Sequence, residues 1–263
     1  MKYLASVFVA ASALSAAEPA QHIDVGKLPQ QATLVEDVIV PVPSEVFGVL
    51  DKLGSPNWHE VLRSVKAEPP GARPQTALML GSVIAEGFIA VEAQESEEVK
   101  KIGRGVLNLS KAIGVEKAVV ARSKAIIEFA DKKDWQRVRK ELDGALADVK
   151  QAMSELHDEE LAQLVSLGGW LRGTEALTQV VKKNYTKDSA ELLHQPSLLE
   201  FFQRRLNAMN ARLKKDEVVA QVQKRLPEIK PLIGEASSVI SQKSVDQINA
   251  IVSELVKSIN AKE

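Results

Sequence analysis

The sequence contains no cysteine among its 263 residues, and this absence excludes several chemistries at once. Without a thiol the chain has no disulfide, no cysteine nucleophile and no cysteine metal ligand. Aromatic residues are also scarce, at 4% of the chain, whereas Ala, Val, Leu, Lys and Glu are abundant. That composition is typical of chains that build helical cores from aliphatic side chains. An all-α fold is therefore expected.

Familiar catalytic patterns are missing as well. The sequence holds neither a G-x-x-x-x-G-K phosphate loop nor a G-x-S-x-G serine elbow. Gly103-x-Gly105 continues with Asn108 where a dinucleotide loop requires a third glycine. Glu191-x-x-His194 has the spacing of a di-iron ligand pair, but no second pair completes such a site. No cofactor and no metal are predicted, and enzymatic activity stays an open question.

Residues 1–17 have the layout of a secretory signal. Lys2 is the positive head, residues 3–14 form a short apolar segment, and small residues occupy the cleavage positions before Glu18. The apolar segment is shorter than the roughly 20 residues that span a bilayer, so a cleaved signal is favoured over an anchor. We expect export to the periplasm or the cell exterior.

The rest of the chain divides by composition. Residues 18–34 hold prolines and glycine among polar residues and predict a flexible leader. Residues 35–263 are expected to form a single helical domain, with a candidate subdomain hinge in the proline-rich stretch 66–75. Residues 33–42 are the one place where a strand can be argued, since valine and isoleucine are frequent there. No window of eighteen apolar residues follows the signal, so no transmembrane segment is expected in the mature chain.

Helix signals dominate after residue 44 and predict about ten helices in an irregular bundle of antiparallel hairpins. Ser96 and Gly114 are expected to bound one helix, and Asp134 to cap another whose apolar stripe reaches Leu156. Ser197-x-x-Glu200 has the spacing of a capping box and predicts a helix that continues to about Leu213. Shorter heptad-spaced stripes follow near the C-terminus. They contain too few heptads for a free coiled coil, and packing within the chain is the simpler interpretation.

The most apolar segment is 76–93, which should be a helix enclosed by others. Its spacing Gly81-x-x-x-Ala85 would let a neighbouring backbone approach closely. Glu86 is an isolated charge in this segment. Such a charge needs a partner if the helix is enclosed.

A polar line along the predicted helix 159–185 offers that partner. Arg172 and Glu175 are three residues apart and can pair, and Gly168, Gly169 and Gly173 would leave room beside them. If this helix neighbours Glu86, the three charges form either an ionic network that fixes helix register or a pocket for a small anionic or amphipathic ligand. In the pocket hypothesis Arg172 receives the ligand and Trp170 supplies an apolar wall.

Charge is segregated along the chain. Residues 100–140 hold twelve Lys or Arg and four Asp or Glu, a net charge of +8, whereas residues 141–175 hold two and eight, a net charge of −6. Pairing between antiparallel helices would neutralise much of this, and a basic face for an anionic polymer is the alternative. The overall net charge of −1 and the few aromatics argue against a nucleic-acid partner.

Two functional hypotheses follow. The first is an exported, non-enzymatic helical protein that binds a protein or polymer partner in the cell envelope or outside the cell. The second is a ligand binder or enzyme whose pocket is lined by Glu86, Trp170, Arg172 and Glu175.

Overall fold

The computed structural model describes residues 33–35, 38–40, 56–234 and 238–261. All of the described residues lie in one compact unit, Gln31–Glu263. The predicted signal, residues 1–17, and nearly all of the predicted leader, residues 18–34, lie outside the described residues.

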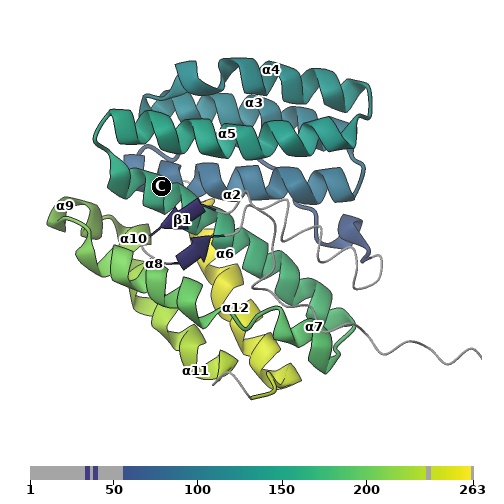
Figure 1. The fold of residues 1–263 in the computed structure, drawn as a ribbon, viewed down its shortest axis with the longest axis vertical. Helices are drawn as coiled ribbons and strands as arrows, with labels where there is room; N and C mark the ends of the chain where they lie inside the picture. Colours follow the sequence, from purple (N-terminus) through teal and green to yellow (C-terminus); the bar gives the residue numbers. More distant parts are fainter. Residues whose placement is uncertain (1–32, 36–37, 41–55, 235–237, 262–263) are drawn as a thin grey trace, which may run out of the picture. The chain divides into compact units, whose positions relative to one another are not determined.

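Helices make up most of the described chain, which confirms the predicted all-α class (Figure 1). The helical elements are η2 Trp58–Glu60, α2 Arg73–Glu92, α3 Ser96–Ile113, α4 Glu116–Asp131, α5 Trp135–Glu155, α6 Glu159–Lys183, α7 Lys187–Glu191, α8 Pro196–Ala208, α9 Ala211–Lys214, α10 Glu217–Arg225, η3 Leu226–Ile229, α11 Lys230–Ile233 and α12 Gln242–Ile259. Two three-residue strands, β1 Thr33–Val35 and β2 Val38–Val40, pair antiparallel with Leu34 opposite Ile39. This hairpin falls where the sequence allowed a strand.

Several predicted boundaries are set by the expected residues. Gly114 ends α3 in the left-handed region, at φ 90°, which favours glycine. The side chain of Asp134 accepts a hydrogen bond from the backbone N–H of Arg137 and so caps α5. His157, at φ 57°, separates α5 from α6. These local signals therefore predict the α3–α6 hairpins well.

One helix boundary was predicted wrongly. A capping box at Ser197 was expected to start a helix that continues to about residue 213, but α8 starts at Pro196 and ends at Ala208. The side chain of Asn210 then accepts hydrogen bonds from the next backbone N–H groups and starts α9. Because asparagine at an N-cap competes with helix continuation, the single predicted helix becomes two.

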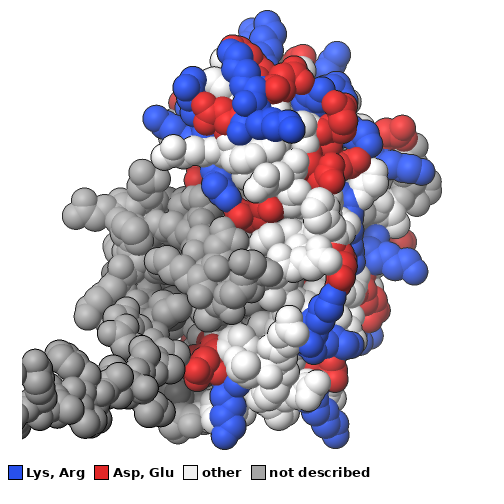
Figure 2. All heavy atoms as spheres, turned by 90° about the vertical axis from the view of Figure 1, so that its right-hand side faces the viewer, with Lys and Arg blue, Asp and Glu red and all other residues white. Residues whose placement is uncertain are grey.

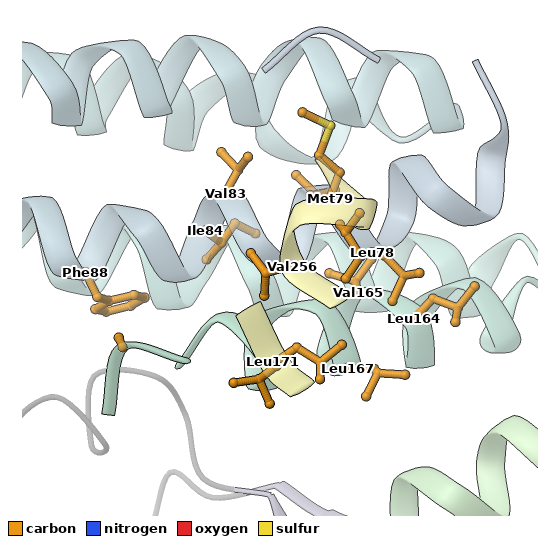
Figure 3. Close-up of a cluster of buried hydrophobic side chains, with 14 of the residues drawn as sticks. Leu78, Met79, Val83, Ile84, Phe88, Leu164, Val165, Leu167, Leu171 and Val256 are labelled. Carbon is orange, nitrogen blue, oxygen red and sulfur yellow. The ribbon is translucent and has the colours of Figure 1, made fainter. Parts of the chain in front are cut away.

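The hydrophobic core is centred on α2, which packs against α3, α5, α6 and α12. Apolar side chains of α2 and α6 interdigitate with Val256 of α12 (Figure 3). By length and mean hydropathy α2 could cross a membrane, contrary to the expectation of no such segment, but 94% of its most apolar window is buried within the protein. Packing against other helices accounts for its apolar surface.

Glycines bring α2 and α6 into backbone contact. A Cβ atom at Gly81 would lie 1.8 Å from the carbonyl oxygen of Val165, and one at Gly168 would lie 1.9 Å from that of Leu78. Neither position can hold a larger residue without separating the helices. The predicted close approach at Gly81 is thus confirmed, and its partner is α6. This contact places the charged residues of the two helices opposite each other.

Candidate functional site

The structure brings three of the four predicted site residues together. Glu86 lies on α2, whereas Arg172 and Glu175 lie one turn apart on the facing side of α6. All three are buried, with exposed fractions of 3%, 1% and 0%. The predicted contact between the two segments is therefore present, and its charges are removed from solvent.

Arg172 uses its whole guanidinium group inside the protein. Its Nε donates to Oε2 of Glu86 at 2.5 Å, and its Nη1 donates to Oε2 of Glu175 at 3.4 Å. Its Nη2 donates to the backbone carbonyl of Val61 at 2.7 Å and to Oε1 of Glu86 at 3.3 Å. These bonds use four of the five N–H donors of a guanidinium, and the side chain is 1% exposed, so Arg172 is committed to partners inside the protein rather than to an anionic ligand.

Arg63 completes the cluster, and the sequence analysis did not single it out. Its backbone N–H donates to Oε1 of Glu86 at 2.7 Å, and its guanidinium Nη2 donates to Oε1 of Glu175 at 2.5 Å. The cluster thus holds two arginines and two glutamates and is neutral. Arg63 lies outside the long helices, where no helical periodicity shows which way a side chain points. The sequence spacing therefore could not pair it with Glu175.

Arg63 belongs to residues 56–72, which we call the strap. Apart from η2, the strap has no helix or strand, and it lies across the bundle before α2 begins. Val61 is buried beside the charged cluster, and Ala67 lies so close to Gly105 of α3 that a Cβ there would be 2.4 Å from the Cβ of Ala67. The stretch 66–75, considered as a hinge, includes the end of this strap and the first turn of α2.

The room predicted beside Gly168 and Gly169 is occupied by α2, whereas a Cβ at Gly173 would meet no atom within 4 Å. Gly168 and Gly169 face the backbone of α2 and hold the helices together rather than lining a cavity. A neutral, hydrogen-bonded and buried cluster at this contact matches the first of the two interpretations, an ionic network that fixes helix register.

Trp170 lies apart from the charged cluster. Its indole Nε1–H donates to Oε1 of Gln195 at 3.1 Å, and its ring packs on Phe202 with centroids 5.5 Å apart. It borders a small pocket with Leu177 of α6 and Ile233 of α11, among others. The free space there is about 10 Å³, roughly what one water molecule needs. The four candidate residues therefore do not form a common ligand pocket.

Lys150 of α5 is a half-buried charged group outside this cluster. Burial lowers the pKa of its ammonium group below the ordinary value of 10.5. The folded protein therefore disfavours the protonated form of this lysine.

Histidines and carboxylates do not converge elsewhere. Among the described residues there is no group of three or more His, Asp or Glu arranged to hold a metal ion. Nδ1 of His194 lies 3.6 Å from the carboxylate of Glu191, one turn away on the chain. This is the local pair whose spacing the sequence showed.

The segregated charges are partly paired as predicted. Arg122 of α4 reaches the acidic stretch, with its guanidinium 3.0 Å from Glu141 and 2.9 Å from Asp148 of α5. Other cations of the basic stretch use carboxylates of their own stretch, as Lys132 does with Glu128. Figure 2 shows both signs interspersed at the top of the view, the level at which Figure 1 draws α3, α4 and α5. Local pairs leave the excess of positive charge in place.

Four exposed cations on the α3–α4 hairpin contribute to this excess. They have no ion pair among the residues that the structure describes, and we call them the α3–α4 basic face: Arg104, Lys111, Lys117 and Lys124. Glu116 is the only acidic residue in the sequence from 99 to 127, and it is half-buried.

The hairpin places these cations in two rows. On each helix they are seven residues apart, or about 10.5 Å along the axis. The hydroxyl of Ser123 donates to the carbonyl of Gly103 at 2.6 Å, which sets Lys124 of α4 level with Arg104 of α3. The turn at Gly114 brings the other two cations near one another. The result is a fixed array of positive charge.

Comparison of the chain with protein-family models, with curated proteins and with solved structures gives no match.

Proposed function

We propose that this chain is an exported, non-enzymatic helical protein that binds an anionic polymer of the cell envelope or the cell exterior through the α3–α4 basic face. The observation that carries this proposal is the array of four exposed cations on two rigidly packed helices. Their positions are set by the hairpin, so a polyanion binds without first ordering the surface.

The chemistry favours phosphate or carboxylate groups on a flexible chain over nucleic acid. Base recognition on single strands relies on aromatic side chains that stack on bases. The aromatic residue nearest to these cations in the sequence, Phe129 of α4, is half-buried, and the guanidinium of Arg137 lies over its ring, 5.0 Å from the centroid. The face thus offers charge without a stacking platform.

Binding to a labelled polyphosphate and a labelled polygalacturonate tests the proposal and separates phosphate from carboxylate recognition. Four cationic contacts predict that the logarithm of the binding constant falls with the logarithm of salt concentration with a slope of about −3. The combined variant R104Q/K111Q/K117Q/K124Q should bind at least about 10-fold more weakly, since each lost contact weakens polyanion binding.

A matched control removes the same charge elsewhere. Lys187, Lys215, Lys243 and Lys257 are exposed and have no ion pair among the described residues. The variant K187Q/K215Q/K243Q/K257Q has the same net charge as the first, and it should bind like the unmodified protein. Equal loss in both variants would mean that net charge alone, and not this face, attracts the polymer.

Export has its own test, which does not depend on the ligand. The signal layout of residues 1–17 supports cleavage before Glu18. Sequencing the N-terminus of the protein isolated from its own cells should give a chain that begins at Glu18. A chain in the cytoplasmic fraction with its first residues intact would refute this part of the proposal.

A further inference from the structure

The strap supplies three specific contacts to the charged cluster. The carbonyl of Val61 accepts from Arg172, the backbone N–H of Arg63 donates to Glu86, and the guanidinium of Arg63 donates to Glu175. All three come from a stretch of three residues, and two of them come from its backbone. Backbone contacts of this kind do not depend on which chain supplies them.

Without the strap, α2 and α6 hold an incomplete site. Glu86, Arg172 and Glu175 are buried and together carry one negative charge. An unpaired buried charge is unfavourable, so this arrangement requires a cation from outside the two helices. Arginine fits this site better than lysine, because the planar guanidinium group binds a carboxylate from a fixed direction.

The missing groups define a short peptide. The site takes a carbonyl from one residue and, two residues later, an N–H and a guanidinium. An apolar residue in the first position fits, because Val61 itself is buried there. Any segment with an apolar residue, any residue and then arginine can supply this set.

The strap carries Trp58 and Val61 into the hydrophobic core, and Leu62, Val65 and Ala67 pack against that core, so a segment that replaces the strap must also supply apolar side chains. The backbone of the strap, in contrast, is not tied into the long helices. The side chain of Arg63 is 40% exposed, so the outer end of the site is open to solvent. Residues 62–70 form neither helix nor strand, and Gly71 adopts φ 108° with no atom within 4 Å of a Cβ there. Lifting this stretch breaks no helical hydrogen bond.

We propose that the contact between α2 and α6 is a binding site for an arginine-containing segment of a partner protein, and that Val61–Arg63 occupies it in the resting protein. The partner segment replaces the strap, and its arginine takes the place of Arg63 between the two carboxylates. This site is separate from the α3–α4 basic face and takes a ligand of opposite charge, so either proposal can fail alone.

The test uses a fluorescein-labelled peptide with the sequence of residues 57–66, NWHEVLRSVK, and the full-length protein. In the unmodified protein the strap competes at an effective concentration in the millimolar range. The variant Arg63→Ala removes the guanidinium of this competitor. It should bind the peptide at least about 10-fold more tightly than the unmodified protein, because the site is free for a larger fraction of the time.

Three controls separate this site from nonspecific binding. Ser64→Ala changes an exposed residue of the same strap and should leave peptide binding as in the unmodified protein. A peptide with alanine in place of its arginine should not bind the Arg63→Ala protein. The additional change Glu175→Gln should remove the gain, since the carboxylate that receives the guanidinium is lost.

The proposal is overturned if the Arg63→Ala protein has an unchanged circular dichroism spectrum and shows no arginine-dependent binding of the peptide. If that variant does not fold, the unmodified protein labelled with 5-fluorotryptophan gives the answer. Trp58 lies in the strap and is buried. At millimolar peptide its fluorine resonance should move to the position of an exposed tryptophan, and a resonance that stays in place refutes displacement of the strap.

Discussion

Replacing Gly168 with alanine is expected to destabilise the fold, although alanine is the better helix former. The new Cβ would lie 1.9 Å from the carbonyl oxygen of Leu78, and the next two atoms within reach belong to the same backbone. An ordinary contact requires about 3.4 Å, so α2 and α6 would separate by about 1.5 Å. The backbone of α2 cannot move aside to relieve this contact, whereas the end of a flexible side chain could.

The magnitude follows from two opposing effects. Overpacking of a core costs about 1–3 kcal/mol, and a clash with backbone belongs at the upper end. The gain in helix propensity from glycine to alanine is about 0.5–1 kcal/mol. The net loss is at least about 2 kcal/mol, which lowers the Tm of a domain of this size by about 4–8 °C.

Gly173 provides the matched control on the same helix. A Cβ there meets no atom within 4 Å, so Gly173→Ala should stabilise the protein by about 0.5–1 kcal/mol. Thermal and urea unfolding followed by circular dichroism at 222 nm measure both variants. The explanation is refuted if Gly168→Ala is as stable as the unmodified protein, or if both variants lose stability equally. In either case Gly168 would not be needed for the close contact between α2 and α6.

Three further predictions use the same unfolding measurements. Arg172→Met should lower the free energy of unfolding by about 3–5 kcal/mol, because it leaves Glu86 and Glu175 buried with one cation between them. A smaller loss would mean that water reaches the cluster. Gln75→Ala should lower the free energy of unfolding by about 1–3 kcal/mol, because the Gln75 amide donates to three carbonyls at the end of α12. Faster hydrogen exchange confined to the end of α12 would confirm this cause. Burial lowers the pKa of Lys150 in the folded state, so stability should rise as the pH increases from that lowered pKa toward the unfolded value of 10.5. In Lys150→Met this part of the pH dependence should be absent.

The helices were predictable where local chemistry sets them. Gly114 and Asp134 act within one turn of the chain, and their effect on α3 and α5 needs no knowledge of the rest of the protein. The same rules were misleading at Ser197, where Pro196 sets the start of the helix first. Local rules therefore predict that a helix is present more reliably than they predict where it begins, when two capping signals are adjacent in the sequence.

The charged cluster was predictable only in part. A glutamate in an apolar helix requires a partner, and the pair Arg172 and Glu175 on another apolar helix was the natural candidate. Trp170 was also assigned to the site, as the apolar wall of a ligand pocket. On a helix, residues two apart point in different directions, and Trp170 accordingly contacts Gln195 and Phe202. Helical geometry could have separated it from the charges at the start.

Arg63 determines whether this cluster is more than a structural ion network. A network formed only to fix the register of α2 and α6 would be complete within those two helices. Here the two helices leave one negative charge unmatched, and a strap outside them provides the cation through a side chain that is 40% exposed. An exposed group that neutralises a buried charge can be exchanged for an equivalent group with little disturbance of the core, which a fully enclosed pair does not permit. In the resting protein the cluster is an ionic network between the strap and the two helices, and the proposed exchange of Arg63 for a partner's arginine rests on this balance of charge.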